Sequence, residues 1–445
     1  MMRRSWSLGC LRVVAIGTLV AAAGPGTEAA ARRNAPRHAE LDAATELLLV
    51  EDHRVPLVYL RIELPMGNWS RWMRESGGAR AFELQLDDAR RSLRSEIDAL
   101  GAEVVLRVGS RAARLEASCL AEDLPDLAAL VGRILRGSEL DAREDRRRRR
   151  EARLSWDLAV RRPVFRARRA QAELWFQPDD PRRRRYDRPA GPALSSRRAV
   201  ELRDTLLRTS PRRVGFAGDV SWEQAERLAR ELLPAASGAV PARREPAAPL
   251  AATVQPSVAG GPAVAVSLRG ATQVHFAYAR DSLPHDHADY PAFRVADHVL
   301  GGHFYSRLHR ALRHEGGETY AAYSVDLGDV VAGLYLLETF TRSENADVVE
   351  AKLRGVLEQF HARGITREER DAAVGFLRGR RGFARQSPQQ RLDRALRELR
   401  LGLPDAFLDA VAESASRLAV EQINAFIADY FEPARFAMVR VEPLE

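Results

Sequence analysis

Arg313 and Tyr320 are the two side chains whose types and spacing best suit chemistry on a peptide. They lie seven residues apart in the segment LHRALRHEGGETYAAYS, on either side of a Gly-Gly pair. A guanidinium offers a planar fork of N–H donors to a carbonyl or carboxylate, and a phenol adds a hydroxyl beside it. The pair indicates peptide-backbone or oxyanion recognition. A surface arginine and a half-buried tyrosine would give the same spacing, so this structural alternative stays open.

The local pattern predicts how these two side chains are positioned. LHRALRHE, residues 308–315, has the pattern of a helix end, and Gly316-Gly317 supplies a left-handed stop. TYAAYSVDLG, from Thr319, begins a strand. The end of a helix and the start of a strand should therefore meet at a tight corner.

The longer segment from Thr272 to Ser324 contains three motifs: Leu300-Gly301-Gly302, Ser306-Arg307-Leu308 and Leu312-Arg313 through Tyr320. In their order and spacing they resemble the C-terminal half of the pitrilysin/insulinase family of zinc metallopeptidases, with Glu318 in place of the customary leucine. In the family, the residues equivalent to Arg313 and Tyr320 bind and polarise the substrate peptide, at a zinc site carried by the other half of a clamshell. The resemblance implies the same roles here.

Active members of the family carry HxxEH in the N-terminal half, where two histidines bind zinc and the glutamate is the general base. When the family motif is aligned with residues 77–85, Arg80 and Leu84 stand at the two histidine positions. Only the glutamate of the motif is present, as Glu83, a relic of the general base. The third ligand falls near Asp157. A guanidinium and an isobutyl group have no lone pair for zinc. We therefore expect no metal in this chain and a zinc ion in a partner subunit.

Histidines elsewhere do not restore the site, because none of the ten lies between residues 54 and 274. His285 and His287, in LPHDHADYP, are the alternative ligands, and we interpret them as solvated loop residues.

The net charge of +8 comes largely from arginine, much of it in residues 143–153 and in PRRRRYDRP from Pro181. The first run is interleaved with acidic residues and has a helical pattern. It contains no aromatic side chains on which nucleic-acid bases could stack. It indicates a solvated helix face and no nucleic-acid partner.

Residues 1–31 have a basic start, an apolar stretch and small residues suited to cleavage, which predicts a signal peptide and a periplasmic or secreted protein. The apolar stretch is shorter than the roughly 20 residues that a bilayer span requires, so no stable membrane span is expected. Cys10 precedes the apolar core, and its loss would leave Cys119 without a disulfide partner.

Two similar halves are visible in the order of predicted elements. Strand-like runs starting at residues 58, 114 and 213 recur, with helix-like segments between them, at 274, 334 and 435. This repetition predicts an α+β fold of two homologous α/β-sandwich domains, each with helices on one face of a sheet. The predicted boundaries are residues 40–233 for the N-terminal domain, 234–262 for a Pro/Ala/Gly-rich linker and 263–445 for the C-terminal domain.

Three functional hypotheses follow. In the first, the chain is the non-catalytic, Arg/Tyr-bearing subunit of an exported zinc-peptidase heterodimer, inactive alone, that contributes peptide-binding and oxyanion contacts. The second is a peptide-binding or scaffolding protein of the envelope without hydrolysis. The third is a self-sufficient metalloendopeptidase that rebuilds a site from Glu83, Asp157 and a displaced histidine, although two carboxylates suit Mg²⁺ or Ca²⁺ better than zinc.

Overall fold

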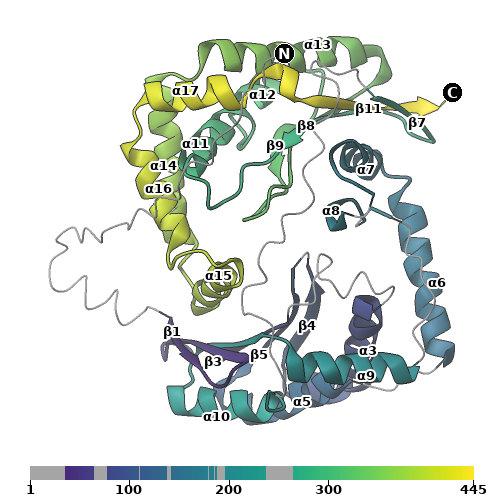
Figure 1. Ribbon diagram of the computed structural model, residues 1–445, viewed down its shortest axis with the longest axis vertical. Coiled ribbons are helices and arrows are strands. Elements are labelled where there is room, and N and C mark those ends of the chain that lie inside the picture. Colours follow the sequence, from purple (N-terminus) through teal and green to yellow (C-terminus); the bar gives the residue numbers. More distant parts are fainter. Residues whose placement is uncertain are drawn as a thin grey trace, which may run out of the picture. The chain divides into compact units, whose positions relative to one another are not determined.

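Two mixed β-sheets organise the protein, as the computed structural model shows in Figure 1. The described residues are 36–64, 78–109, 111–137, 142–178, 180–184, 186–187, 196–236 and 264–444. The predicted signal peptide lies outside them, as do residues 237–262 of the predicted linker. None of the helices within the described ranges is long and apolar enough to cross a membrane.

The first sheet has the strand order β1-β2-β6-β3-β5-β4. The second has the order β7-β11-β8-β10-β9. The strands of the first sheet are β1 (Arg37–Glu40), β2 (Thr45–Glu51), β3 (Leu57–Leu64), β4 (Glu103–Val108), β5 (Ala113–Leu120) and β6 (Arg212–Gly218). Those of the second are β7 (Val264–Arg269), β8 (Val274–Asp281), β9 (Ala322–Asp326), β10 (Leu334–Thr341) and β11 (Ala437–Leu444).

The two sheets have the same topology once the edge strand β1 is set aside. β2 pairs with β6 in parallel, β7 pairs with β11 in parallel, and every other pairing is antiparallel. The sequence predicted that β3 corresponds to β8, β5 to β10 and β6 to β11. The two strands of each of these matches occupy the same position in the strand order of their own sheets. The α+β fold with an internal duplication is therefore confirmed.

Helices of both halves surround these sheets. The N-terminal half contributes α3 (Gly78–Ser92), α4 (Arg94–Ala99), α5 (Leu124–Arg136), α6 (Ala142–Ala159), α7 (Pro163–Trp175), α8 (Pro181–Arg184), α9 (Ser196–Thr209) and α10 (Trp222–Leu232). The C-terminal half contributes α11 (Tyr290–Leu300), α12 (Arg307–His309), α13 (Ala346–Arg363), α14 (Arg367–Phe383), α15 (Pro388–Leu401), α16 (Phe407–Arg417) and α17 (Val420–Tyr430).

Several helix ends follow from local sequence. The side chain of Ser221 accepts a hydrogen bond from the backbone at the start of α10. Thr366 and Ser387 form capping boxes with the Glu or Gln three residues later and so begin α14 and α15. Gly402 ends α15 in the left-handed conformation, with φ of 66°, which glycine adopts without a Cβ penalty.

One face of each sheet is covered by helices of its own half, as predicted. α3, α5 and α10 cover the first sheet with buried side chains such as Leu86, Leu127 and Leu228. α11, α13, α14, α16 and α17 share one apolar core with the second sheet, which includes Phe293 and Leu353. Cys119 of β5 lies in the first core, where burial raises the pKa of its thiol to about 12. Such a thiol is almost entirely protonated at neutral pH.

The second face of each sheet is also covered, and here the structure goes beyond the sequence prediction. α15, from the C-terminal half, packs Leu392 and Leu396 against Leu48, Val50 and Ala217 of the first sheet. The two leucines are 0% and 1% exposed. α15 lies close to β2 and β6, and Figure 1 shows it beside the first sheet.

The opposite exchange places α7, from the N-terminal half, on the second sheet. Ala167, Ala172 and Trp175 pack there against β8, β10, β11 and neighbouring strands. The fully buried Gln171 amide donates to the backbone carbonyls of Ala277 at 2.6 Å and Ala437 at 2.8 Å. Each half therefore supplies a helix that completes the core of the other.

Ion pairs fix both exchanged helices. On α7, Arg168 makes a bidentate pair with Glu338 of β10, at 2.8 and 2.6 Å. On α15, Asp393 accepts from Arg61 of β3 at 2.9 Å. Bidentate guanidinium–carboxylate pairs fix orientation as well as proximity.

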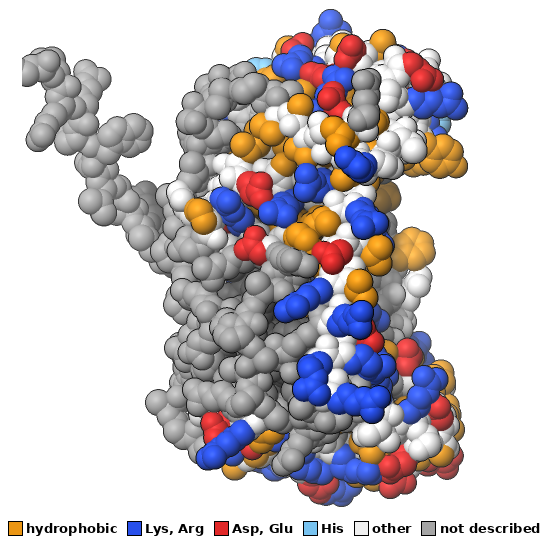
Figure 2. Space-filling model, turned by 90° about the vertical axis from the view of Figure 1, so that its right-hand side faces the viewer, with side chains coloured by type: hydrophobic (Ala, Val, Ile, Leu, Met, Phe, Trp, Pro, Cys, Tyr) orange, Lys and Arg blue, Asp and Glu red, His pale blue; other side chains and the backbone are white. Residues whose placement is uncertain are grey.

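The described arginines of α6 are exposed, including Arg146 and Arg150. Arg147 lies 3.8 Å from Glu151 one turn later. Figure 2 shows basic side chains gathered on this side of the molecule with acidic ones interspersed. This arrangement fits the solvated helix face expected from the sequence.

We expect Leu392→Ala to lower the free energy of unfolding by about 2–5 kcal/mol, because it opens a cavity between α15 and the first sheet. Leu154→Ala on α6 is the matched control, since Leu154 is 54% exposed and should change stability little. Urea unfolding at equilibrium measures both. Equal effects of the two variants would show that α15 does not contribute to the core of the first sheet.

Candidate functional site

Arg313 lies between two exposed aromatic rings. Its guanidinium carbon is 4.6 Å from the centroid of the Tyr320 ring and 5.0 Å from that of Phe304. Tyr320 is 74% exposed and Phe304 is 48% exposed. Arg313 is half-buried, and in the described part of the chain it makes no ion pair with a carboxylate. The structure thus brings the two predicted residues together and presents an uncompensated guanidinium beside an exposed phenol.

His309 positions the guanidinium of Arg313 through a hydrogen bond. Arg313 Nη1 donates to His309 Nε2 at 3.2 Å, and the imidazole also hydrogen-bonds to the backbone of Ala322. His309 is 7% exposed, and its burial, together with the positive charge of Arg313, lowers the pKa of the imidazole. Because a neutral imidazole has one acceptor nitrogen, this low pKa preserves the contact that positions Arg313. His309 was not predicted as part of the site, although its position one helical turn before Arg313 indicates that the two side chains are neighbours.

The corner between the helix and the strand has the predicted turn. Arg313 lies in a π-helical segment, Arg310–His314, which continues α12. Gly317 has φ of 68°, and its backbone N–H donates to the Arg313 carbonyl at 3.1 Å. Gly316 does not adopt a positive φ, so only the second glycine is the left-handed residue. β9 then begins at Ala322.

Glu318, which replaces the leucine of the family motif, has a specific partner. Its carboxylate accepts from Lys352 of α13 in a short ion pair, and its backbone carbonyl accepts from Thr341. Lys352 is the only lysine of the chain. This ion pair connects the loop that carries Tyr320 to α13. Lys352 was not predictable as this partner from the sequence, because 34 residues separate it from Glu318.

The glycines of the Leu-Gly-Gly motif allow close approach between α11 and β9. A Cβ on Gly301 would lie 2.7 Å from the backbone nitrogen of Ser324, which donates to the Gly301 carbonyl at 3.1 Å. A Cβ on Gly302 would lie 3.0 Å from the Asp297 carbonyl oxygen. These contacts require glycine, so the motif has a structural reason here.

The Ser-Arg-Leu motif anchors the start of the helix that carries Arg313. Ser306 caps α12 by accepting from the backbone of His309, and Leu308 is fully buried. Arg307 makes a bidentate pair with Glu369 of α14 at 2.8 and 2.6 Å. The resemblance therefore rests on residues that position the site as well as on those that form it.

The predicted relic of the zinc site lies on α3, where the backbone of Arg80, Glu83 and Leu84 is helical. The side chains of Arg80 and Leu84 lie outside the described part, and that of Glu83 is half-buried. Asp157 is half-buried on α6. No group of three or more His, Cys, Asp or Glu side chains within the described ranges is placed to hold a metal ion. Together with the residue types, this geometry does not fit zinc.

Gln85 follows this relic and is fully buried. Neither its amide nitrogen nor its amide oxygen has a hydrogen-bond partner among the described residues. A buried amide without hydrogen bonds is destabilising, so Gln85 is an unfavourable polar residue in the core-facing side of α3.

The histidines outside this site are mostly structural. His285 is 5% exposed and lies 4.6 Å from Tyr290, so our interpretation of it as a solvated residue is wrong. The reason is that its loop folds back on α11 and is held by a hydrogen bond to the Asp329 carbonyl. His287 is half exposed. His298 stacks on His303 at 3.9 Å and on Phe376 at 4.4 Å.

The comparisons with known proteins agree with this description. Residues 213–376 match the family model described as "Peptidase M16 inactive domain". A curated relative, "Non-peptidase homolog YmxG" of Helicobacter pylori, is 28% identical over 141 residues, which are 31% of this chain and 32% of that protein. The alignment thus spans about a third of the curated relative.

Solved structures share the fold over almost the whole chain. The M16 inactive domain from Pseudomonas fluorescens matches 92% of this chain and 98% of its own length, with a TM-score of 0.75 and 17% identity. The periplasmic protease PqqL from Escherichia coli matches 92% of this chain with a TM-score of 0.68 and 14% identity, but only 46% of its own chain is covered.

The chain therefore has the two-domain fold of the M16-like solved structures, and residues 213–376 match the M16 inactive domain. The resemblance predicted from sequence is confirmed by this match and by the shared fold, and the sequence lacks the HxxEH motif. The match to the inactive domain supports the expectation that this chain is not a peptidase on its own.

We expect Gln85→Met to raise the free energy of unfolding by about 1–2 kcal/mol, because it removes a buried amide without hydrogen bonds and conserves volume. Gln177→Met, at an exposed position, is the control. Chemical denaturation compares the two. A destabilised Gln85→Met protein would indicate that the Gln85 amide has a polar partner.

Acid should destabilise the protein through His298. Burial, with the neighbouring charges of His303 and two arginines, lowers the pKa of His298 to about 4. The unfolded chain, with a pKa near 6.5, therefore takes up this proton first, and stability present above that value is lost as the pH falls toward 4. By pH 5 the loss from this residue is roughly 2 kcal/mol.

His298→Phe keeps the stacked ring and removes the titration, so its stability should fall less between pH 7 and pH 5 than that of the natural protein. His287→Phe, at an exposed position, is the matched control for replacing an imidazole with a phenyl ring. Denaturant unfolding at each pH measures the difference. Parallel pH profiles for the natural and His298→Phe proteins would contradict the assignment.

Proposed function

We propose that this chain is the non-catalytic subunit of an exported zinc-peptidase heterodimer. Arg313 binds the substrate carbonyl and stabilises the developing oxyanion, Tyr320 donates a hydrogen bond beside it, and a second M16 subunit supplies HxxEH and zinc. The observation that carries the proposal is the guanidinium of Arg313, positioned by His309 and two aromatic rings but not neutralised by a carboxylate.

Electrostatics favour this role. A donor held in place before the reaction stabilises developing negative charge without reorganisation. An internal carboxylate would compete with substrate for the guanidinium, and the described part of the chain places none there. The nearest polar partner, His309, is an uncharged acceptor and leaves the cation available.

The division between subunits also has a physical basis. Positioning of a peptide carbonyl and activation of water can be done by separate surfaces that meet in one chamber. The partner would then supply the zinc ligands that this chain lacks at Arg80 and Leu84. PqqL, more than twice as long as the region matched here, shows that this fold also occurs as part of a larger chain.

An extended peptide could add to an open strand edge. β4 and β9 are the edge strands nearest to the relic and to the Arg/Tyr pair in sequence. The outer side of β9 is partly occupied, because Ser324 donates to the Gly301 carbonyl. We therefore favour β4 for backbone pairing with a peptide.

Export is part of the proposal and rests on the sequence of residues 1–31. The likeness of fold to a periplasmic protease is compatible with it. Detection of a shortened N-terminus by mass spectrometry of the protein from its native source would test this step.

The partnership is tested by affinity purification of the full chain from its native source, followed by mass spectrometry and zinc analysis. The expected partner is an M16 chain with HxxEH, and zinc should follow the complex. The isolated chain should hold less than about a tenth of an equivalent. If the chain alone binds one equivalent, and Glu83→Gln with Asp157→Asn abolishes it, this chain is itself a metalloenzyme. A chain that binds peptides with no zinc-bearing partner would instead be an envelope binding or scaffolding protein.

We expect Arg313→Lys to reduce peptide turnover by the reconstituted complex about tenfold or more, because a point charge cannot replace the fork of donors. Arg310→Lys is the matched control, since Arg310 is exposed in the same π-helical segment. Steady-state hydrolysis of a fluorogenic peptide measures both. Equal turnover for the two variants would remove Arg313 from the proposed site.

A further inference from the structure

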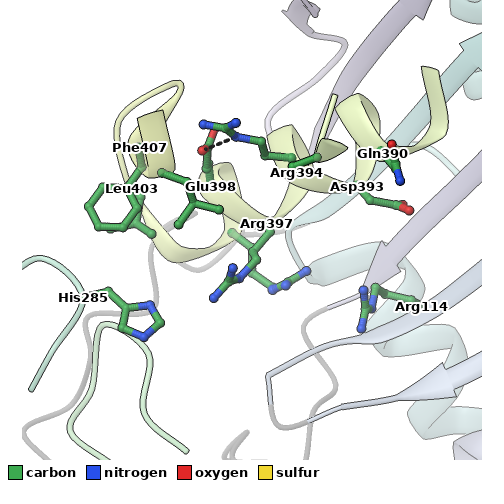
Figure 3. A pocket seen from close by; sticks show the side chains of 12 residues that line it. Arg114, His285, Gln390, Asp393, Arg394, Arg397, Glu398, Leu403 and Phe407 are labelled. Carbon is green, nitrogen blue, oxygen red and sulfur yellow. Dashed lines mark hydrogen bonds and ion pairs between the residues drawn. The ribbon is translucent and has the colours of Figure 1, made fainter. Parts of the chain in front are cut away.

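A cavity of about 440 Å³ lies where α15 and the start of α16 face the first sheet. Its lining includes Arg114 of β5, Arg397 of α15 and His285 of the loop after β8. Arg313 and Tyr320 do not line it. Its size is in the range of small-ligand sites. Figure 3 shows the Arg397 side chain extending into the space between His285 and Arg114.

The acidic side chains of this cavity are already engaged. Asp393 accepts from Arg61 at 2.9 Å, and Glu398 accepts from Arg394 at 2.9 Å. Glu63, which lies opposite Arg114 across the β3–β5 pair, makes a short ion pair with Arg400. The local carboxylates are thus matched to other arginines.

Two guanidiniums remain without such a partner. Within the described ranges, neither Arg114 nor Arg397 makes a hydrogen bond or ion pair with a carboxylate. Arg114 is half-buried on a strand, where a cation without a counter-ion is less favourable than at an open surface. An anion bound in the cavity would neutralise the positive charge of Arg114 and so offset the unfavourable free energy of its burial.

The wall beside Arg397 is apolar. Leu403, Phe407 and Leu408 contribute it, and Leu403 and Phe407 are each 9% exposed. Figure 3 shows Leu403 and Phe407 on the His285 side of the cavity. The site therefore combines donors for an anion with a surface for a hydrocarbon side chain.

We propose that this cavity binds the C-terminal carboxylate of a peptide that ends in an apolar residue. Arg114 and Arg397 donate to the carboxylate, and the apolar wall contacts the terminal side chain. Planar guanidinium forks match the two oxygens of a carboxylate. The choice of a peptide as ligand rests on the proposed function, whereas the anion site rests on the cavity alone. The site would hold the end of a peptide away from Arg313.

The test is isothermal titration of the full chain with N-acetyl-Phe-Leu as the free acid, its C-terminal amide and inorganic phosphate. We expect the acid to bind and the amide to bind at least about tenfold more weakly, because the amide lacks the charge that the guanidiniums recognise. Arg114→Gln and Arg397→Gln should each weaken binding of the acid, and the double variant should weaken it at least about tenfold.

Arg363→Gln, at an exposed arginine near the end of α13 that does not line the cavity, is the matched control. Because Arg397 is exposed on a helix surface, Arg397→Gln should keep the circular dichroism of the natural protein. Equal binding of acid and amide, or unchanged binding by the double variant, would overturn the proposal. Phosphate that binds as tightly as the acid would show a general anion site and overturn the peptide assignment.

Arg313→Lys separates this inference from the proposed function. It should retain dipeptide binding while the complex loses turnover. If turnover is unaffected but the dipeptide still binds, the subunit proposal fails and the cavity proposal stands. If turnover falls as expected and the dipeptide does not bind, the cavity proposal fails and the subunit proposal stands.

Discussion

The exchange of α7 and α15 between the two halves is the interaction on which the rest of the structure depends. A two-layer domain leaves the second face of its sheet exposed, and here each half covers the other's. Gly215 on β6 shows how close the contact is, because a Cβ there would lie 2.7 Å from Leu392. Neither half has a complete apolar core without the other. The cavity lined by Arg114 and Arg397 exists because α15 meets the first sheet.

The repeated fold was predictable because strands of both halves show similar apolar runs in the same order. The exchange of helices was not, because α7 and α15 have amphipathic patterns that are equally satisfied by either sheet. Only the three-dimensional arrangement determines which sheet each helix covers. The buried glutamine of α7, Gln171, lies at this contact, and its sequence neighbours gave no indication of its two carbonyl partners.

Prediction of the candidate site was similarly uneven. Arg313 and Tyr320 were assigned roles from the family resemblance of their segment, and the glycine turn between them indicated that they lie close together. His309 belongs to the same local segment, but its role depends on burial by β9 and Phe304. The pairing of Glu318 with Lys352 depends on how α13 packs, so no local pattern predicts it. The relic on α3 was located by alignment with the family motif, and the residue types then excluded zinc there, since Arg80 and Leu84 have no lone pair for a metal.

The pairing of Lys352 with Glu318 has a chemical consequence. All other basic side chains that are cationic at neutral pH are guanidiniums, which remain protonated and react slowly with acylating reagents. Apart from an α-amino group, the chain offers a single primary amine, and that amine is held by the loop that leads to Tyr320. The rate of acylation at Lys352 would therefore report how often this loop releases α13, without any introduced label.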